Sequence, residues 1–483
     1  MSEVKYYLAV DLGASSGRHI LAHMEDGKIV LEEMHRFWNG NDKVEINGET
    51  HRIWDTDRIF HEIITGMKKC AEAGKIPVSM GVDTWGVDYC LIGADGEKIG
   101  YCYGYRDHRT EGMREKVYEI VPERELYEHT GIQYATFNTI YQLMAAKLQE
   151  PETLEKAGAM LQMPDYFHYC LTGVAKQEYT EASTGQLLSV ETNDWDWEII
   201  DRLGFPRKIF KEICMPGTYV GNLKPEVQKE VGFDCKVIMP ATHDTGSAVM
   251  SVPSEKEDTL YISSGTWSLM GCELLKANTS EAAMAANFTN EGGYDHRYRF
   301  LRNIMGLWMI QSVKAELEAG YAYPGRTEGD DYSFANLCDM ASKETIDSLV
   351  EANDERFLAP ESMIKEVQKA CAEAGAQVPE TPWQLARVIY RSLAVCYRDA
   401  TEQLEQITGK HFEAINIVGG GSNASWLNEL TAKETGRVVL AGPGEATAIG
   451  NVGCQMLADG VFTDLFDLRR TVYTSFGVKR YEP

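Results

Sequence analysis

The segment DLGASSGR, from Asp11 to Arg18, has the composition of a phosphate-binding loop. Glycine and serine let the backbone come close to a polyphosphate, and successive N–H groups and hydroxyls can donate to its oxygens. Asp11, at the end of the preceding apolar run, is a candidate Mg²⁺ ligand through a water molecule. The Walker A spacing GxxxxGK[ST] is absent, and an ordinary Gly/Ser hairpin explains the segment equally well.

Two further glycine-bearing segments could contact a nucleotide. Residues 263–266, SSGT, offer the same backbone donors as the first loop, although a simple hairpin turn explains them in isolation. The run 419–421, GGG, lets the chain pass close to a flat ligand such as adenosine, although a strand-to-helix turn also fits. It lacks the GxGxxG spacing of a dinucleotide fold. Two such phosphate loops facing each other across a cleft would grip a triphosphate from both sides.

Asp244, within ATHDTGSA at 241–248, is the candidate general base. Transfer of a γ-phosphoryl group needs positioning, charge neutralisation and a group that accepts the proton of the alcohol. A carboxylate at a helix N-terminus stays ionised, because the helix dipole and the free N–H groups favour the negative form. His243 could hydrogen-bond a sugar hydroxyl. An ordinary helix cap is the competing interpretation of Asp244.

Residues 81–88, GVDTWGVD, combine an aromatic side chain with carboxylates, as sugar-binding sites commonly do. Trp85 fits either a sugar platform or a core position. Asp83 and Asp88 are the rivals of Asp244 for the role of base.

These segments require strands that end at the loops. Alternating and continuous apolar runs predict strands at 6–10, 18–24, 29–34, 77–83, 87–92, 259–262, 267–274 and 413–418. Helical spacing and caps predict helices at 55–74, 382–408, 424–436 and 445–460. A strand, a Ser/Gly loop and a second strand occur both at the start and near the middle of the chain, which indicates a duplicated domain.

Length and charge restrict the number of domains and the kinds of partner that we expect. The 483 residues, 44% of them hydrophobic, suit two large domains. A formal charge of −26 makes nucleic acids and anionic membranes improbable partners. We expect a cytoplasmic protein, because the sequence contains no long apolar stretch and its N-terminus runs directly into a predicted strand. The oligomeric state is left open.

Cysteine and histidine usage points away from disulfides and zinc. The 11 cysteines are scattered and include no CxxC pair, so buried reduced thiols are expected. His19 and His23 lie four apart in a predicted strand without a third ligand.

The order of several motifs resembles the FGGY family of carbohydrate kinases. The motifs run from about residue 6 to about residue 470 and are VDLGASSGR, GVDTWGVD, YRDHRT, MPDYFHY, HDTGSAV, YISSGTWSLMG, NEGG, RNIMGLW and IVGGGSN. The resemblance implies an α/β fold of two actin-like (ribonuclease H-like) domains flanking a central catalytic cleft. Residues 1–245, with an insertion at about 110–215, would form the sugar-binding domain, and residues 246–483 would form the nucleotide-binding domain.

The resemblance also implies an activity and a set of site residues. The expected reaction is phosphorylation of a ketose by MgATP, with the 1-hydroxyl of L-rhamnulose as acceptor and L-fuculose or xylulose as alternatives. Residues implied to bind ATP are Ala14, Ser15, Ser16, Gly17, Arg18, Thr266, Gln311 and Gly420. Residues implied to bind the sugar are Gly86, His243, Asp244, Thr245 and Asn303, with Asp244 as proton acceptor.

Two other classes of protein stay open at this point. The phosphate loops alone would also permit an actin-like ATPase switch that phosphorylates no small molecule, although the sugar-side cluster of Trp85, His243 and Asp244 disfavours it. A catalytically inactive sugar-binding protein would need a damaged Asp244 or DLGASSG loop, and both are intact.

Overall fold

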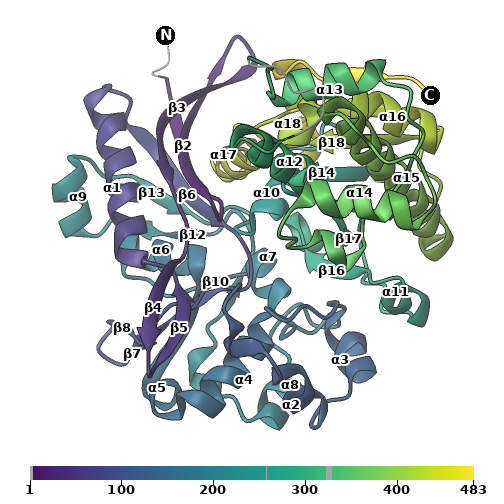
Figure 1. The fold of residues 1–483 in the computed structure, drawn as a ribbon. Helices are drawn as coiled ribbons and strands as arrows, with labels where there is room; N and C mark the ends of the chain where they lie inside the picture. Colours follow the sequence, from purple (N-terminus) through teal and green to yellow (C-terminus); the bar gives the residue numbers. More distant parts are fainter. Residues whose placement is uncertain (1–3, 257, 323–328) are drawn as a thin grey trace. The chain divides into compact units, whose positions relative to one another are not determined.

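The computed structural model of the chain describes residues 4–256, 258–322 and 329–483. They form two compact units, whose elements are labelled in Figure 1. The first unit comprises Met1–Ser251, Glu273–Phe300 and Thr447–Ser475, and the second comprises Val252–Cys272, Leu301–Ala446 and Phe476–Pro483.

A mixed sheet forms the centre of the first unit, with the strand order β12-β13-β6-β1-β2-β3 (Figure 1). Its strands are β1 (Tyr6–Leu12), β2 (Ser16–Glu25), β3 (Lys28–Trp38), β6 (Pro77–Thr84), β12 (Tyr219–Asn222) and β13 (Lys236–Ile238). β1, β2 and β3 pair as antiparallel hairpins, whereas β6 runs parallel to β1, and β13 runs parallel to β6. Parallel pairing places the carboxyl ends of β1, β6 and β13 at the same edge of the sheet.

The predicted strands at 6–10, 18–24, 29–34 and 77–83 are confirmed as β1, β2, β3 and β6, and each extends further than predicted. β2 begins at Ser16, two residues earlier than predicted, because its start pairs with the end of β3. The polar loop between β1 and β2 therefore consists of residues 13–15 only.

Helices surround this sheet and build the rest of the unit. They are α1 (Thr56–Glu72), α2 (Met113–Tyr118), α3 (Glu123–Thr130), α4 (Thr139–Gln149), α5 (Pro151–Lys156), α6 (Met163–Thr172), α7 (Tyr179–Ala182), α8 (Trp197–Leu203), α9 (Pro225–Val231), α10 (Asp244–Met250), α11 (Glu281–Ala285), α17 (Ala446–Ala458) and α18 (Leu465–Ser475). The predicted helix at 55–74 is confirmed as α1, whose first turn is capped by Asp55 through the N–H of Arg58.

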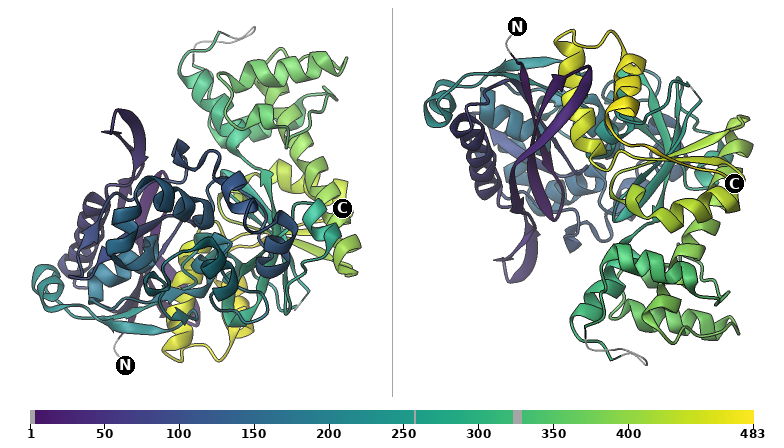
Figure 2. Two further views of the ribbon diagram at one scale, coloured as in Figure 1. Left: turned by 90° about the horizontal axis from the view of Figure 1, so that it is seen from below. Right: turned by 90° about the horizontal axis from the view of Figure 1, so that it is seen from above.

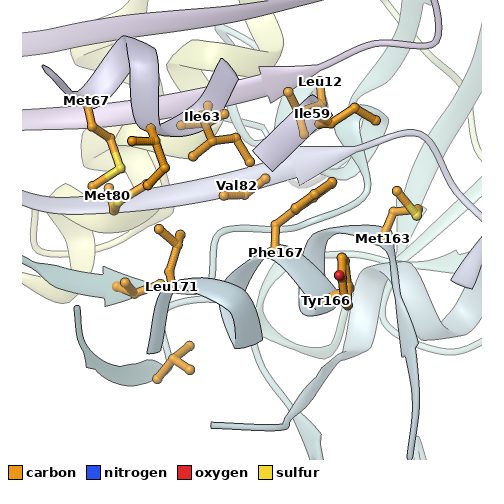
Figure 3. Packing of buried hydrophobic residues seen from close by; sticks show 14 of the residues in the cluster. Leu12, Ile59, Ile63, Met67, Met80, Val82, Met163, Tyr166, Phe167 and Leu171 are labelled. Atoms are coloured by element: carbon orange, nitrogen blue, oxygen red, sulfur yellow. The ribbon is translucent and has the colours of Figure 1, made fainter. Parts of the chain in front are cut away.

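The two faces of the sheet differ in polarity. Met80 and Val82 of β6 point to the face covered by α1 and α6, where apolar side chains form one buried cluster (Figure 3). Ser79 and Asp83 alternate with them and point to the other face. There Ser79 donates a hydrogen bond of 2.7 Å to Gln455 of α17. One face of the sheet therefore packs in the apolar core, and the other face carries polar side chains that hydrogen-bond to α17.

The chain between β6 and β12 adds a layer with its own core. It contains the sheet β8-β7-β9, formed by β7 (Tyr89–Gly93), β8 (Lys98–Ile99) and β9 (Ala157–Gln162), and the helices α2 to α8. Leu126, Tyr141 and Ile199 belong to a second buried apolar cluster. Short strands elsewhere in the unit are β4 (Asp42–Ile46), β5 (Glu49–Ile53), β10 (Gln177–Glu178), β11 (Ile213–Cys214) and β16 (Thr289–Gly292).

The sheet of the second unit includes the consecutive strands β17-β15-β14-β18-β19-β20. They are β14 (Leu260–Ser264), β15 (Trp267–Leu274), β17 (Tyr298–Met305), β18 (Ala414–Val418), β19 (Val438–Ala441) and β20 (Lys479–Tyr481). β14 pairs antiparallel with β15 on one side and parallel with β18 on the other, as β1 does with β2 and β6. This repeated topology supports the predicted duplication, and it makes the β14–β15 loop the counterpart of the β1–β2 loop.

The helices of the second unit are α12 (Trp308–Glu318), α13 (Phe334–Lys343), α14 (Met363–Glu373), α15 (Pro382–Thr408) and α16 (Ser425–Thr435). α13 and α16 both lie along α15 (Figure 2). α15 has the predicted bounds, because the Thr381 side chain accepts from the N–H of Gln384 at its start and Gly409 adopts φ 67° at its end.

The division of the chain differs from the predicted boundary between residues 245 and 246. The first unit continues to Ser251 and includes two later segments, Glu273–Phe300 and Thr447–Ser475. The physical reason is the packing of α10 against α17 and α18. The Arg469 side chain of α18 donates to the carbonyl of Val249 at 2.9 Å and to Glu273 at 2.8 Å.

Among the described residues, the structure has no helix that is both long and apolar enough to cross a membrane.

A close approach between α17 and α10 provides a test of this packing. A Cβ atom on Gly450 would lie 1.7 Å from the backbone oxygen of Ser247. We predict that Gly450→Ala lowers the free energy of unfolding by about 3 kcal/mol or more, since one of the two backbones must move. In the control Gly453→Ala the added Cβ meets only the Leu468 side chain, at 2.6 Å, and this side chain can rotate. Equal losses in thermal unfolding of the two variants would contradict the packing.

Candidate active site

Two aspartates lie opposite each other where β1 and β6 approach the shared sheet edge. Asp11 and Asp83 are register partners in the parallel pair. Beyond the end of β6, the N–H of Thr84 donates to the carbonyl of Thr242 at 2.9 Å, which directs the chain toward α10. Asp244, the first residue of α10, therefore lies just beyond the same edge of the sheet.

The Asp83 carboxyl is buried and only partly hydrogen-bonded. The side chain is fully buried, and one oxygen accepts from Asn451 at 2.6 Å while the other has no hydrogen-bond partner. Burial raises the pKa of the Asp83 carboxyl well above its usual range, and the charges of Asp11 and Asp244 raise it further. Asp83 thus lies within electrostatic reach of two other carboxylates at this edge.

Asp244 is the accessible member of this carboxylate group. Its side chain is 31% exposed, while Asp83 is fully buried. One oxygen accepts from the N–H of Thr245 at 2.6 Å and lies 3.6 Å from a ring nitrogen of His243. Burial raises the pKa of Asp244 above its ordinary value of 3.8. His243, Arg299 and the Thr245 N–H oppose this increase, and Asp11 adds to it.

A buried arginine organises the residues next to Asp244. The Arg299 guanidinium donates to Thr245 Oγ1 at 2.6 Å, to His243 Nδ1 at 3.0 Å and to the carbonyl of Gly292 at 2.7 Å. The Glu291 carboxylate lies 3.1 Å from Arg299 and 3.2 Å from His243 Nδ1. Burial alone would raise the pKa of Glu291, but Arg299 and His243 outweigh it and lower the pKa. Arg299 and Glu291 therefore fix the positions of the His243 and Thr245 side chains.

Gly86 lies beside this network. A Cβ atom on Gly86 would lie 3.4 Å from His243 Nε2 and 3.3 Å from Thr184, so the glycine leaves room in front of the imidazole. The next residue, Val87, has φ 73°, a strained conformation for a β-branched residue. Hydrogen bonds hold it there, from its N–H to Glu181 at 3.1 Å and from Thr139 to its carbonyl at 2.8 Å.

Trp85 and Asp88 occupy core positions rather than an open surface. Trp85 packs against Trp54, with the ring centroids 3.9 Å apart and the ring planes tilted by 30°, and both indole N–H groups donate to one oxygen of Asp88. The Tyr105 N–H donates to the same oxygen, and Gln142 donates to the other. Burial raises the pKa of Asp88 to about 6. A fully buried carboxylate with four donors fixes the surrounding chain and is poorly placed to accept a proton from a substrate.

The predicted phosphate loop is a compact hairpin end. Within it, the Gly13 N–H donates to the Ser16 carbonyl at 2.9 Å, and Asn39 donates to the carbonyl of Gly13 at 2.8 Å. Ser15 lies at the exposed tip of this loop. Ser16, Gly17 and Arg18 belong to β2.

Two members of this segment have structural roles of their own. A Cβ atom on Gly17 would come within 2.2 Å of the Phe37 ring, so only glycine fits there. Arg18 donates to Asp11 at 2.6 Å. A loop and a basic side chain thus lie next to the carboxylate edge.

The second unit brings together most of its predicted ATP-binding residues. Thr266 donates to the side chain of Gln311 at 3.3 Å. The triple glycine lies against the same loop, because a Cβ atom on Gly421 would overlap Ser264 Oγ at 1.9 Å. Gly420 is exposed, with open space around its Cα. Asn303, in β17, is exposed and belongs to the second unit, whereas the other predicted sugar-side residues belong to the first.

Sequence reasoning missed three residues of the first unit's site. Glu291 and Arg299 were present in or near quoted motifs without an assigned role, and Asn451 lay in an ordinary helical pattern. The NEGG motif at 290–293 was the available signal for Glu291. Nothing in the spacing of the sequence connects Arg299 or Asn451 to His243 or Asp83.

Matches to known families span most of the chain. Residues 6–251 match the N-terminal domain, and residues 260–458 the C-terminal domain, of the FGGY family of carbohydrate kinases. The chain therefore belongs to this family. The predicted two-domain α/β fold and the predicted class, a phosphotransferase with a sugar hydroxyl as acceptor, are confirmed.

Individual proteins of this family are similar to the chain over nearly its full length. A rhamnulokinase of Halalkalibacterium halodurans is 48% identical to this chain, covering 99% of both proteins. Rhamnulokinases of Oceanobacillus iheyensis and Bacillus subtilis are 45% and 40% identical, over 98% and 99% of this chain and 97% and 95% of those proteins.

Solved structures show the same fold at much lower identity. A gluconate kinase from Lactobacillus acidophilus superposes with a TM-score of 0.80 at 18% identity, covering 100% of this chain and 94% of that one. Plasmodium falciparum glycerol kinase with ADP gives a TM-score of 0.76 at 14% identity, covering 99% of this chain and 94% of that one.

The Arg299 charge provides a test of the site's electrostatics. In a reaction in which Asp244 accepts the proton, activity rises as pH rises through its pKa, so the acid limb of kcat/KM would lie above pH 3.8. Arg299 lowers the pKa of Asp244. We predict that the acid limb of Arg299→Met lies at a higher pH than that of Arg299→Lys, which keeps the charge.

Both variants lose the guanidinium group of Arg299 and its several hydrogen bonds. The difference between their acid limbs therefore reports the effect of the positive charge alone. Melting curves identify the pH range in which each variant stays folded. Superimposable acid limbs would contradict the electrostatic role of Arg299.

Proposed function

We propose that this chain transfers the γ-phosphoryl group of ATP to the 1-hydroxyl of L-rhamnulose. The observation that carries the proposal is full-length identity of 40–48% to rhamnulokinases. A site that contains an accessible carboxylate beside a fixed imidazole and a glycine-lined space supports it.

Asp244 is the proposed general base. It is partly exposed and lies at the start of a helix, and its carboxyl has a raised pKa, which increases its affinity for a proton. Asp83 is fully buried, and Asp88 is both buried and hydrogen-bonded by four donors. Of the three candidate aspartates, Asp244 is the one whose side chain a substrate hydroxyl could reach.

His243 and Thr245 are proposed to bind sugar hydroxyls, with Gly86 lining the same space. Arg299 and Glu291 hold the Nδ1 side of His243, and its Nε2 lies on the side of Asp244 and Gly86 that is proposed for the substrate. Asn303 of the second unit is a further proposed sugar contact. For ATP, the proposed contacts are Ala14, Ser15, Ser16, Gly17, Arg18, Thr266, Gln311 and Gly420.

The carboxylate edge fits the Mg²⁺ ion that ATP would bring. Carboxylate oxygens are the ligands that Mg²⁺ prefers, and Asp83 has a buried oxygen without a partner. The ion would be held through Asp11, Asp83 and Asp244, directly or through water, and would supply charge neutralisation of the phosphates. Arg18 and the loop N–H groups would bind the phosphates and keep them in place.

The acceptor can be identified with a sugar panel. ADP release is measured with L-rhamnulose, L-fuculose, xylulose or no sugar, at saturating MgATP. We expect the highest kcat/KM with L-rhamnulose and negligible release without sugar. A higher kcat/KM with another ketose would overturn the substrate assignment, and strong ATP hydrolysis unaffected by sugar would favour the ATPase switch.

The base can be identified by comparing two amide substitutions. Asp244→Asn should lower kcat by roughly 10²–10⁴-fold while the ketose still binds in calorimetry, because only proton acceptance is lost. Asp83→Asn should instead weaken Mg²⁺ use and recover at high Mg²⁺ concentration. Rescue of Asp244→Asn by Mg²⁺, or its near-normal rate, would assign the proton acceptor elsewhere.

A further inference from the structure

A second group of ligand-type side chains lies away from the carboxylate edge. Glu49 and His51 belong to β5, and His108 begins a short 3₁₀ helix at His108–Thr110. One ligand atom from each of the three side chains lies within 4.8 Å of the others. Two imidazoles and a carboxylate form a ligand set suited to Zn²⁺, unlike the all-carboxylate set proposed for Mg²⁺.

The Glu49 carboxylate lies near a ring nitrogen of each histidine, and the two imidazole rings are stacked. The Glu49 carboxylate lies 3.6 Å from His108 Nε2 and 3.9 Å from His51 Nε2, and the two ring centres are 4.9 Å apart. Zn–N and Zn–O bonds of about 2.0–2.2 Å place tetrahedral ligand atoms roughly 3.3 Å apart. The two Glu49 distances exceed this by a few tenths of an ångström. The His108 ring, now stacked on His51 at 18°, must turn so that both nitrogens face one ion, and Glu49 and His108 are exposed enough to rotate.

Asp107 orients both histidines. One carboxylate oxygen accepts from His51 Nδ1 at 3.0 Å and from the N–H of Arg109 at 3.0 Å, and the other accepts from the N–H of Arg52 at 2.6 Å. Because the Nδ1–H of His51 donates to Asp107, its Nε2 lies on the side of Glu49, where it is the nitrogen placed to bind a metal. A carboxylate behind a metal-binding imidazole is the usual arrangement in zinc sites. The same aspartate caps the turn that presents His108.

We propose that Glu49, His51 and His108 form a binding site for a divalent transition metal of the Zn²⁺ type, with water completing its coordination. Such an ion would link the β4–β5 hairpin to the loop that follows Gly104. This loop includes Tyr105, whose N–H donates to Asp88, so the ion would stabilise the chain next to the sugar side.

A second cluster of similar composition in the same unit is not proposed to bind a metal ion. Glu125, His129 and Glu198 also lie within 4.8 Å of one another. There Arg202 pairs with Glu125 at 2.5 Å and lies 3.6 Å from Glu198, so a cation is already present. In the part of the chain that the structure describes, the ion pairs of Glu49 are with the two histidines alone. The second cluster therefore serves as a built-in control.

Co²⁺ titration of the untagged, chelator-treated full-length protein tests the proposal. We expect visible d–d absorption from cobalt bound by imidazole, displaced by Zn²⁺ but not by excess Mg²⁺. His108→Asn and Glu49→Gln should each raise the Zn²⁺ dissociation constant at least tenfold, while His129→Asn should leave it unchanged. Zn²⁺ should also raise the melting temperature of the wild type but not of His108→Asn.

The two exposed positions keep the test independent of folding. Kinase activity of His108→Asn with Mg²⁺ should equal that of the wild type, which separates this site from phosphoryl transfer. Zn²⁺ affinity that is the same in His108→Asn as in the wild type, or absorption that is lost in His129→Asn instead, would overturn the proposal. Absence of cobalt absorption would also overturn it.

Discussion

Burial of neighbouring carboxylates at one sheet edge is the constraint on which the proposed chemistry depends. Parallel pairing of β1 and β6 sets Asp11 opposite Asp83, and packing of α10 against α17 fixes where Asp244 begins its helix. Burial and neighbouring charges raise the pKa values of Asp83 and Asp244. A folded pKa above the unfolded one means that each group stabilises the fold at acidic pH, and that this contribution is lost as pH rises through the folded pKa. A divalent cation would offset that loss and favour the ionised base.

Local signals in the sequence were sufficient for the elements that carry this edge. The apolar run before Asp11, the Ser/Gly loop after it and the helix beginning at Asp244 all have short-range patterns. The same is true of α15, where a capping threonine and a terminal glycine fix both ends. The recurrence of the strand–loop–strand pattern also indicated the repeated topology of the second unit. These features depend on neighbours in the sequence, and patterns of period 2 or 3.6 report them directly.

The support for His243 was beyond local reasoning. Arg299 lies 56 residues after His243, and its role depends on the burial and direction of its guanidinium, which no local spacing encodes. Asn451 reaches Asp83 from a helix more than 360 residues later. The unit boundary moved for the same reason, because α17 and α18 return to the first unit through tertiary packing. Trp85, compatible with either a core or a sugar-facing position, is resolved as core by its packing against Trp54.

The most direct test of the carboxylate edge is a ¹³C NMR titration of the aspartate carboxyl carbons, with and without saturating Mg²⁺ and a nucleotide. Asp83→Asn and Asp244→Asn assign the two signals, and apparent pKa values are compared as a coupled pair. The account predicts that in the metal-free protein the pKa of Asp83 lies well above 3.8 and that of Asp244 lies above 3.8, and that Mg²⁺ lowers both pKa values. Ordinary pKa values for both groups, unchanged by Mg²⁺, would contradict it.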